Sequence, residues 1–232
     1  HNTCDKHSNA IFVWSTRRQN NNTRFSRLFI IVDMAIQLYV GLVTEGVTDS
    51  RFLQDILERL LINIAYDCRS EVSIESIFSV PKESGAFVDV MTNAAKYAND
   101  NGASILCVHA DSDARSIKEV YDYKITPFLE ALKQVEEEEY CKNIIPIIPI
   151  QMIESWMMAD KELLKERINA KGVRNEDLGF HRPPENYSDP KSTIEQAIAI
   201  TQKDRPRRRR NMVTIADLYE ECKETFRGTI IH

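Results

Sequence analysis

The chain has 232 residues, enough for one large domain or for one domain with an appendage. Its 43% hydrophobic and 28% charged residues are typical of an ordinary soluble globular protein. The formal net charge of -5 excludes nucleic-acid binding through bulk charge, so any contact with phosphate must come from a local basic patch or from bound metal.

The five cysteines are scattered along the chain and contain no CxxC pair. This pattern argues against a disulfide framework and against a structural zinc site, and it favours free thiols in a reducing cytoplasm. The longest apolar stretch, residues 28–43, is interrupted by Asp33 and Gln37 and falls short of the roughly 20 residues that a membrane helix needs. The sequence therefore predicts a cytoplasmic protein that does not bind the membrane.

The first residues differ in composition from the rest of the chain. Residues 1–27 are rich in Asn, Ser, Thr and Arg and show no periodicity, which predicts disorder or a loose arm. Met34 stands directly before a well-patterned strand, so we interpret residues 1–33 as an upstream extension that is dispensable for folding or foreign to the natural protein. The alternative is an N-terminal arm that binds a partner.

From residue 35 onward, the hydrophobic pattern alternates between strands and helices. The expected strands cover residues 36–43, 72–80, 104–110 and 143–150. The expected helices include the apolar face from Leu53 to Ile64 and then cover residues 87–97, 114–139, 152–167, 192–202 and 214–225. Within residues 114–139, a second part is expected to begin with Thr126 as a cap and Pro127 at the first helical position. Pro146 and Pro149 indicate that the fourth strand lies at a sheet edge or ends irregularly.

Strands separated by helices predict parallel βαβ units with helices on both faces. The expected fold class is therefore α/β, with a Rossmann-like, mostly parallel sheet of about four strands flanked by helices. This domain is assigned to residues 34–165. Residues 166–232 are expected to form a helical C-terminal extension that contains a basic loop.

Acidic residues follow three of the expected strands, at the sheet edge where ligands of such folds bind. Glu45 follows the first strand, with Asp49 four residues later. Asp111 and Asp113 follow the third strand, and Glu154 follows the fourth. Clustered carboxylates repel one another without a cation, and their oxygens suit Mg²⁺ or Mn²⁺. The pattern predicts a metal site formed by these five residues.

Each candidate also has a plain structural interpretation. Asp49 and Asp113 can serve as helix caps, and Glu154 can be a solvated helix residue. His109 ends the third strand on the same side as Ile105 and Cys107. It is either a buried structural histidine or a group that supports the acids in proton transfer.

Two segments in these positions resemble the motifs of TOPRIM domains. Residues 39–53, YVGLVTEGVTDSRFL, are similar to the first motif, a hydrophobic strand followed by Glu-Gly and a helix. Residues 105–115, ILCVHADSDAR, are similar to the second, an apolar strand that ends in Asp-x-Asp. Residues 153–156, Ile-Glu-Ser-Trp, resemble a pattern of small stand-alone TOPRIM-like nucleases of bacterial defence systems and mobile elements. An acid at Asp49 is typical of the overcoming-lysogenization-defect-like nuclease branch.

The resemblance implies a Mg²⁺- or Mn²⁺-dependent phosphodiesterase that hydrolyses DNA or RNA, with Glu45, Asp111 and Asp113 as metal ligands and an anti-phage role. The sequence contains no Walker phosphate loop, so an ATPase activity would belong to a partner chain. One alternative is a non-catalytic TOPRIM-like interaction subunit of an ATPase-containing defence complex. Another is a phosphotransfer enzyme, such as a phosphatase, that acts on a small substrate.

One dense basic run, residues 203–210, is the strongest candidate for phosphate contact, and Lys191 is a weaker one. The expected nucleic-acid-binding residues are Arg205, Arg207, Arg208, Arg209, Arg210 and Lys191. The alternative is a solvated loop between the last two helices.

Overall fold

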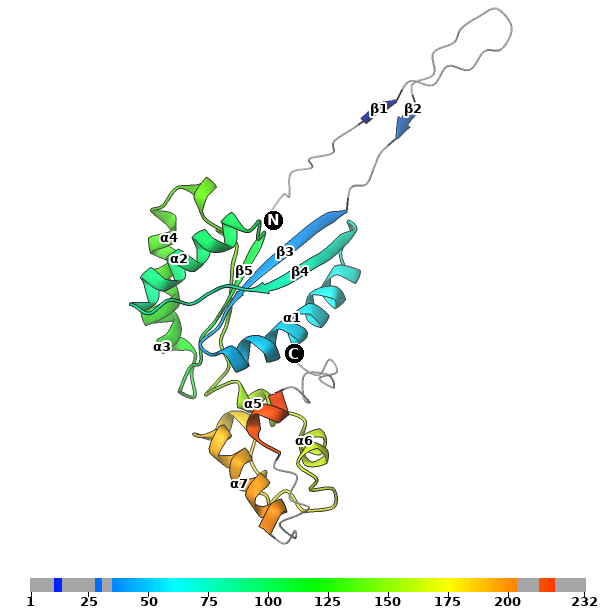
Figure 1. Ribbon diagram of the computed structural model, residues 1–232, viewed down its shortest axis with the longest axis vertical. Helices are drawn as coiled ribbons and strands as arrows, with labels where there is room; N and C mark the ends of the chain where they lie inside the picture. The colour runs from blue at the N-terminus through cyan, green and yellow to red at the C-terminus, as the bar shows by residue number, and fades with distance from the viewer. Residues whose placement is uncertain (1–10, 14–27, 31–34, 204–212, 220–232) are drawn as a thin grey trace, which may run out of the picture.

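A computed structural model describes residues 11–13, 28–30, 35–203 and 213–219. Its centre is a four-stranded, all-parallel sheet with the strand order β4-β3-β5-β6 (Figure 1). The strands are β3 (Ile36–Val43), β4 (Val72–Ser79), β5 (Ile105–His109) and β6 (Ile144–Ile147). The predicted α/β fold class is confirmed.

Helices cover both faces of this sheet. On one face lies α1 (Val47–Tyr66), and on the other lie α2 (Phe87–Asp100) and α4 (Thr126–Lys133) (Figure 1). Successive side chains of a strand point to opposite faces, so β5 contributes Cys107 to the core beneath α1 and Leu106 with Val108 to the core beneath α2 and α4. His109 follows this alternation and therefore lies on the α1 side.

The helical region after β5 differs from the expectation at its centre. It consists of α3 (Lys118–Val120), a π-helical turn (Tyr121–Ile125) and α4, in unbroken succession. Thr126 as a helix cap is wrong, because Ile125 has helical dihedral angles and the helix passes through both residues. Pro127 cannot donate the usual hydrogen bond to the carbonyl four residues earlier, and the π-helical turn before it uses wider spacing, with the Thr126 N–H donating to the Tyr121 carbonyl.

The last strand is short and lies at the sheet edge, as its prolines indicated. β6 pairs only with β5, and Pro146 stands opposite Val108. The strand ends at Ile147 rather than Ile150, and the helix expected over residues 152–167 is two helices, α5 (Glu154–Met157) and α6 (Lys161–Arg167). Asp160 separates them because its side chain accepts a hydrogen bond from the Leu163 N–H and so starts a new helix.

The C-terminal part lies beyond the carboxyl ends of the strands and joins the apolar cluster on the α1 side of the sheet (Figure 1). It contains a short 3-10 turn (Pro184–Asn186), α7 (Pro190–Lys203) and a helical stretch at residues 215–219. Another short 3-10 turn, Glu137–Glu139, precedes β6. Its buried residues join the same apolar cluster as α1, and they include Leu178, Phe180, Ile194, Leu218 and Tyr219. Residues 166–203 and 213–219 therefore share a core with the sheet domain.

Two short strands precede the sheet. β1 (Ile11–Val13) and β2 (Leu28–Ile30) pair with each other in antiparallel fashion. Over the described part of the chain, no helix has both the length and the apolar character needed to cross a membrane.

Candidate acidic active site

The candidate site lies where the order of the strands reverses. The chain runs from β3 through α1 to β4 on one side, and then crosses to β5 on the other side of β3. In open parallel sheets, the connections that leave such neighbouring strands diverge and form the usual ligand site. The turn after β3 carries Glu45 and leads to Asp49 in α1, and the loop after β5 carries Asp111.

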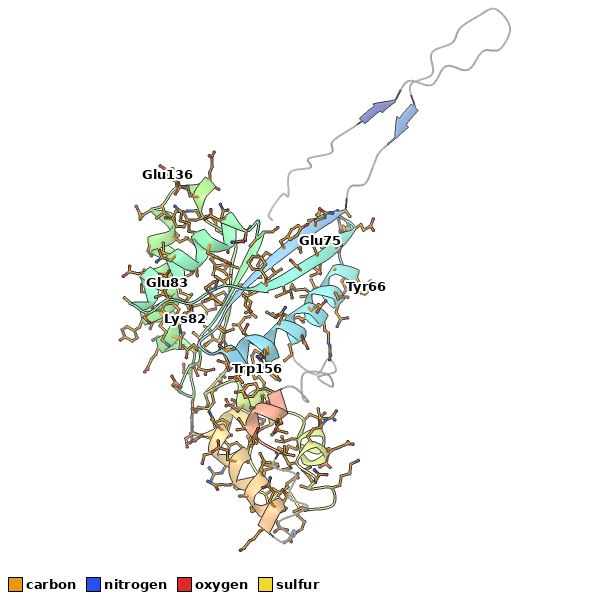
Figure 2. The ribbon with its side chains drawn as sticks, in the orientation of Figure 1. Tyr66, Glu75, Lys82, Glu83, Glu136 and Trp156 are labelled. Atoms are coloured by element: carbon orange, nitrogen blue, oxygen red, sulfur yellow. The ribbon has the colours of Figure 1, made fainter. Side chains whose placement is uncertain are left out.

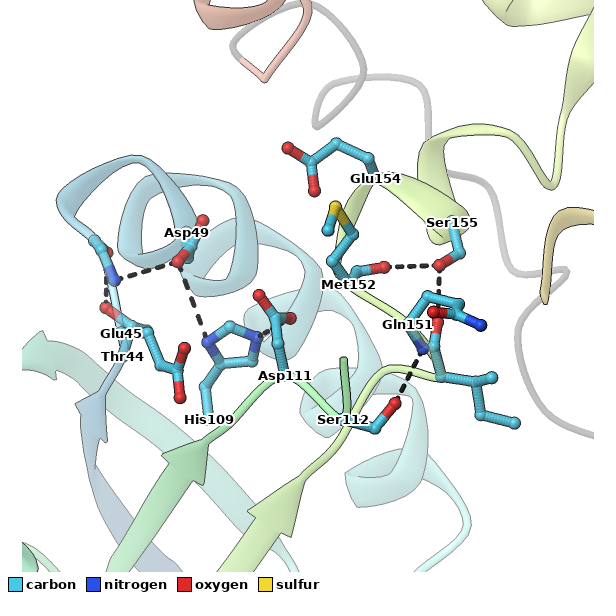
Figure 3. Close-up of polar contacts among 12 residues, drawn as sticks. Thr44, Glu45, Asp49, His109, Asp111, Ser112, Gln151, Met152, Glu154 and Ser155 are labelled. Atoms are coloured by element: carbon cyan, nitrogen blue, oxygen red, sulfur yellow. Dashed lines mark hydrogen bonds and ion pairs between the residues drawn. The ribbon is translucent and has the colours of Figure 1, made fainter. Parts of the chain in front are cut away.

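His109 stands between two of these carboxylates (Figure 3). Its Nε2 lies 3.2 Å from Oδ1 of Asp111, and its Nδ1 lies 4.0 Å from Oδ2 of Asp49. The imidazole is fully buried, whereas the Asp49 and Asp111 side chains are 14% and 18% exposed. Among the residues that the structure describes, neither ring nitrogen of His109 has a partner with hydrogen-bond geometry. The contacts are thus close electrostatic ones that leave both carboxylates able to take another ligand.

Asp49 is oriented by the turn that starts α1. The backbone N–H of Gly46 donates to Oδ2 of Asp49 at 2.9 Å, and the Thr44 hydroxyl donates to the Gly46 carbonyl at 2.7 Å. Asp49 therefore fills the structural role of a helix-start residue and faces His109 as well. Burial raises the pKa of Asp49, and the negative charges of Asp111 and Glu45 raise it further, whereas His109 and the Gly46 N–H act against the rise.

Glu45 lies at the rim of the site and is held by a cation. Its Oε1 is 3.3 Å from Nζ of Lys124, and both side chains are about one-third exposed. Lys124 belongs to the π-helical turn before α4, so a segment on the opposite face of the sheet supplies this contact. At this exposure the ion pair contributes little to stability, and its main effect is to orient Glu45.

The loops that follow β5 and β6 are joined to each other. Gln151 donates its backbone N–H to the buried Ser112 hydroxyl oxygen at 2.8 Å, and Asp113 donates its backbone N–H to the Gln151 carbonyl at 2.8 Å. Asp113 and Gln151 both have positive φ angles, 51° and 66°, which side-chain-bearing residues rarely adopt. Such strain persists where the surroundings enforce it, and here the hydrogen bonds between the two loops hold both residues in this conformation.

Glu154 is buried at the start of α5 and has a partner far along the chain. The hydroxyl of Tyr219 donates to Oε1 of Glu154 at 2.8 Å. Burial raises the pKa of Glu154, and Asp111 raises it as well, whereas the Tyr219 hydrogen bond and the charge of Lys191 lower it. Burial likewise raises the pKa of Tyr219, so its hydroxyl remains a donor. The alternative interpretation of Glu154 as a solvated helix residue is wrong, because Glu154 is buried and bonded to Tyr219 of the C-terminal helical stretch.

The remaining predicted residues are placed less closely. The Asp113 side chain is exposed and takes part in no hydrogen bond or ion pair with the residues that the structure describes. Lys191 acts on Glu154 through its charge. The predicted nucleic-acid-binding residues Arg205, Arg207, Arg208, Arg209 and Arg210 lie outside the described residues.

The acids fit a hard divalent cation in their chemistry. All are oxygen ligands, and Oδ1 of Asp111 is buried and has no hydrogen-bond partner in the described part of the chain. Within residues 35–203 and 213–219, no group of three His, Cys, Asp or Glu side chains is placed to hold one metal ion. The residues that would hold an ion are Glu45, Asp49 and Asp111, and this would require Glu45 to leave Lys124.

Three residues of the site were not predicted from the sequence to contribute to it. Lys124 and Tyr219 come from helices remote in sequence, and nothing in their local pattern marks them. Ser112 lies between Asp111 and Asp113. A serine in a loop often forms hydrogen bonds to the backbone, and this could have indicated the contact between the two loops. Comparison of the chain with family models, curated proteins and solved structures yields no match, so the interpretation of the site rests on its own geometry.

Proposed function

We propose that this chain is a Mg²⁺- or Mn²⁺-dependent nuclease of the TOPRIM kind, which hydrolyses phosphodiester bonds of DNA or RNA. The observation that carries the proposal is the gathering of Asp49 and Asp111 around the buried His109 at the switch point, with Glu45 at the rim. Acids drawn together in this way favour a bound cation, because each negative charge raises the free energy of the others. Lys124, the cation beside Glu45, is partly exposed and can move aside.

The bound ion supplies positive charge that stabilises the negative charge developing on a phosphate. The chain's own residues hold and orient that arrangement. His109 lies between Asp49 and Asp111, and the burial around it excludes water from one side of the site. Glu154, fixed by Tyr219, adds negative charge behind Asp111.

A polymeric substrate fits the charge distribution of the chain better than a small phosphate does. The net charge is -5, and Arg205 with Arg207–Arg210 forms the one concentrated basic segment of the sequence, with Lys191 separate from it. We propose that this segment binds the phosphates on either side of the cleaved bond. The proposal includes an anti-phage role in which a partner chain supplies any ATPase activity.

The test is incubation of the purified chain with single- and double-stranded DNA and RNA. Each substrate is tested with Mg²⁺, with Mn²⁺ and with chelator, and products are separated on denaturing gels. Metal-dependent cleavage that chelator abolishes supports the proposal. Absence of cleavage of every substrate, with partner proteins supplied, contradicts it and favours a non-catalytic interaction subunit.

A further inference from the structure

A cavity of about 530 Å³ opens on the side of Glu45 away from β5, between the ends of β3 and β4. Glu45 and Thr44 form its border toward the acidic site, and the start of α1 and the segment after β4 form the other walls. Figure 2 labels Lys82 and Glu83 on that segment. This volume lies within the range of small-molecule binding sites, roughly 300–1,000 Å³. The acidic site thus has a neighbouring space for a ligand group.

Hydroxyl groups make up much of the cavity's polar lining. Ser50 and Ser79 lie with their Oγ atoms 2.6 Å apart, and either can be the donor. Two hydroxyls that share one hydrogen bond retain one further hydrogen to donate. For the part of the chain that the structure describes, no acceptor for that hydrogen is found, and Ser79 is exposed. The pair can therefore donate to an oxygen or nitrogen acceptor of a ligand.

The charges around the cavity balance and so do not favour a free anion. Glu45 and Glu83 are negative, whereas Lys82 in the lining and Lys124, 3.3 Å from Oε1 of Glu45, are positive. The apolar part of the lining is accessible, since Val47 is 75% exposed and Pro81 is exposed as well. Hydroxyls, carboxylate acceptors and an apolar wall together suit a neutral ligand with hydroxyl groups and a flat ring, which describes a nucleoside. A carboxylate is also the usual acceptor for a sugar hydroxyl in nucleotide sites.

We propose that this cavity, bordered by Glu45, Ser50, Ser79 and Lys82, binds the sugar and base of the nucleotide next to the cleaved phosphate. The assignment of that phosphate rests on the proposed nuclease function, whereas nucleoside binding itself does not. Glu45 is the shared border, so a strand whose phosphate lies at the acids of β3 and β5 has its adjoining nucleoside directed toward β4. The substrate then contacts the chain on both sides of β3, with its phosphate at the acids and its nucleoside in the cavity.

The experiment measures binding in chelator, so that cleavage plays no part. The probes are fluorescently labelled single-stranded DNA and RNA 12-mers, followed by anisotropy, and free adenosine and uridine at millimolar concentration, followed by NMR. Two variants place a large ring in the cavity, Ser84→Trp at its exposed rim and Val47→Trp at the first turn of α1. Ser70→Trp is the matched control, because Ser70 is exposed and lies before β4, at the amino ends of the strands and away from the cavity.

We expect both cavity variants to lose nucleoside binding and to weaken oligonucleotide binding about tenfold, with Ser70→Trp unchanged. Oligonucleotide affinity that is equal in all four proteins, or no nucleoside binding by the unmodified chain, overturns the inference. If nucleosides bind and the cavity variants abolish this, but the unmodified chain cleaves nothing with metal, the cavity assignment holds and the nuclease proposal fails.

Discussion

Along the carboxyl ends of the strands, the region between β3 and β5 and the region beside β6 are built in different ways, and they are called the two halves below. Between β3 and β5, the acids lie within a few residues of the strand ends, and His109 lies between Asp49 of α1 and Asp111 after β5. Beside β6, Glu154 is buried, and its partner Tyr219 comes 65 residues later. The first half is a product of local sequence and strand order, whereas the second depends on a distant segment. The two halves should therefore respond differently to mutation.

The largest effect is expected at the β3–β5 half. Asp111→Asn keeps the size of the side chain and removes the charge that borders His109, so metal binding and stabilisation of the phosphate weaken together. We expect cleavage to fall by about 100-fold or more. The fold should persist, because removal of one of several neighbouring carboxylates relieves repulsion. Cleavage rate and circular dichroism measure the two outcomes.

Asp113→Asn is the matched control for this variant, since it makes the same change two residues away at an exposed side chain. Its loss of activity should be much the smaller of the two. Equal loss in both variants would show that Asp113 moves into the site, as the TOPRIM resemblance implies. Full activity of Asp111→Asn would remove the metal-nuclease proposal.

The β6 half should show its effect in stability. Tyr219→Phe removes the hydroxyl that donates to Glu154 and leaves a buried carboxylate without this donor. We expect the free energy of unfolding to fall by about 1–3 kcal/mol, measured by urea denaturation. Tyr66→Phe removes an equivalent hydroxyl from a side chain that is 83% exposed and should leave stability unchanged. Unaltered stability of Tyr219→Phe would mean that water replaces the lost donor.

A smaller effect is expected from the cation at the rim. Lys124→Gln frees Glu45 from its ion pair and removes a positive charge beside the acids. Mn²⁺ affinity, measured by calorimetry, should rise by about three- to tenfold, because a partly exposed charge of this kind accounts for about 1 kcal/mol. Lys133→Gln disrupts a comparable exposed pair with Glu130 and should not alter affinity. A lower Mn²⁺ affinity in Lys124→Gln would show that Lys124 positions Glu45 for the metal.

The smallest effect is expected at Cys107 in β5, beneath the site, where the thiol should scarcely react with an alkylating reagent. Burial raises the pKa of the Cys107 thiol to about 12 from its ordinary value of 9.0. The folded state therefore keeps this proton when the unfolded state has lost it, so the thiol's contribution to stability is complete below pH 9.0 and is lost as the pH rises through about 12. With iodoacetamide at pH 9, mass spectrometry should find Cys68, which is exposed, alkylated and Cys107 intact. Modification of Cys107 at the rate of Cys68 would indicate that β5 opens.

The contrast between the two halves also explains how far the sequence could be interpreted. The strand from Ile36 to Val43 has the predicted bounds, since its apolar run ends at a clear Glu-Gly turn. Asp49, His109 and Asp111 come together because strand order and alternation suffice to place them. Local pattern did not reveal the π-helical turn that carries Lys124, nor the break at Asp160, since both depend on hydrogen bonds that a helical periodicity conceals. The Tyr219–Glu154 contact depends on tertiary packing, which the periodicity of the sequence does not indicate.

The Tyr219–Glu154 hydrogen bond has a consequence for the order of synthesis. A ribosome makes the chain from its N-terminal end, and structure forms as segments emerge. All four strands of the parallel sheet, and every acid at their ends, have been made before Tyr219 is added. A nascent chain at that stage holds Glu154 without its hydroxyl partner. The final form of the site therefore arises only after the whole parallel sheet has been synthesised.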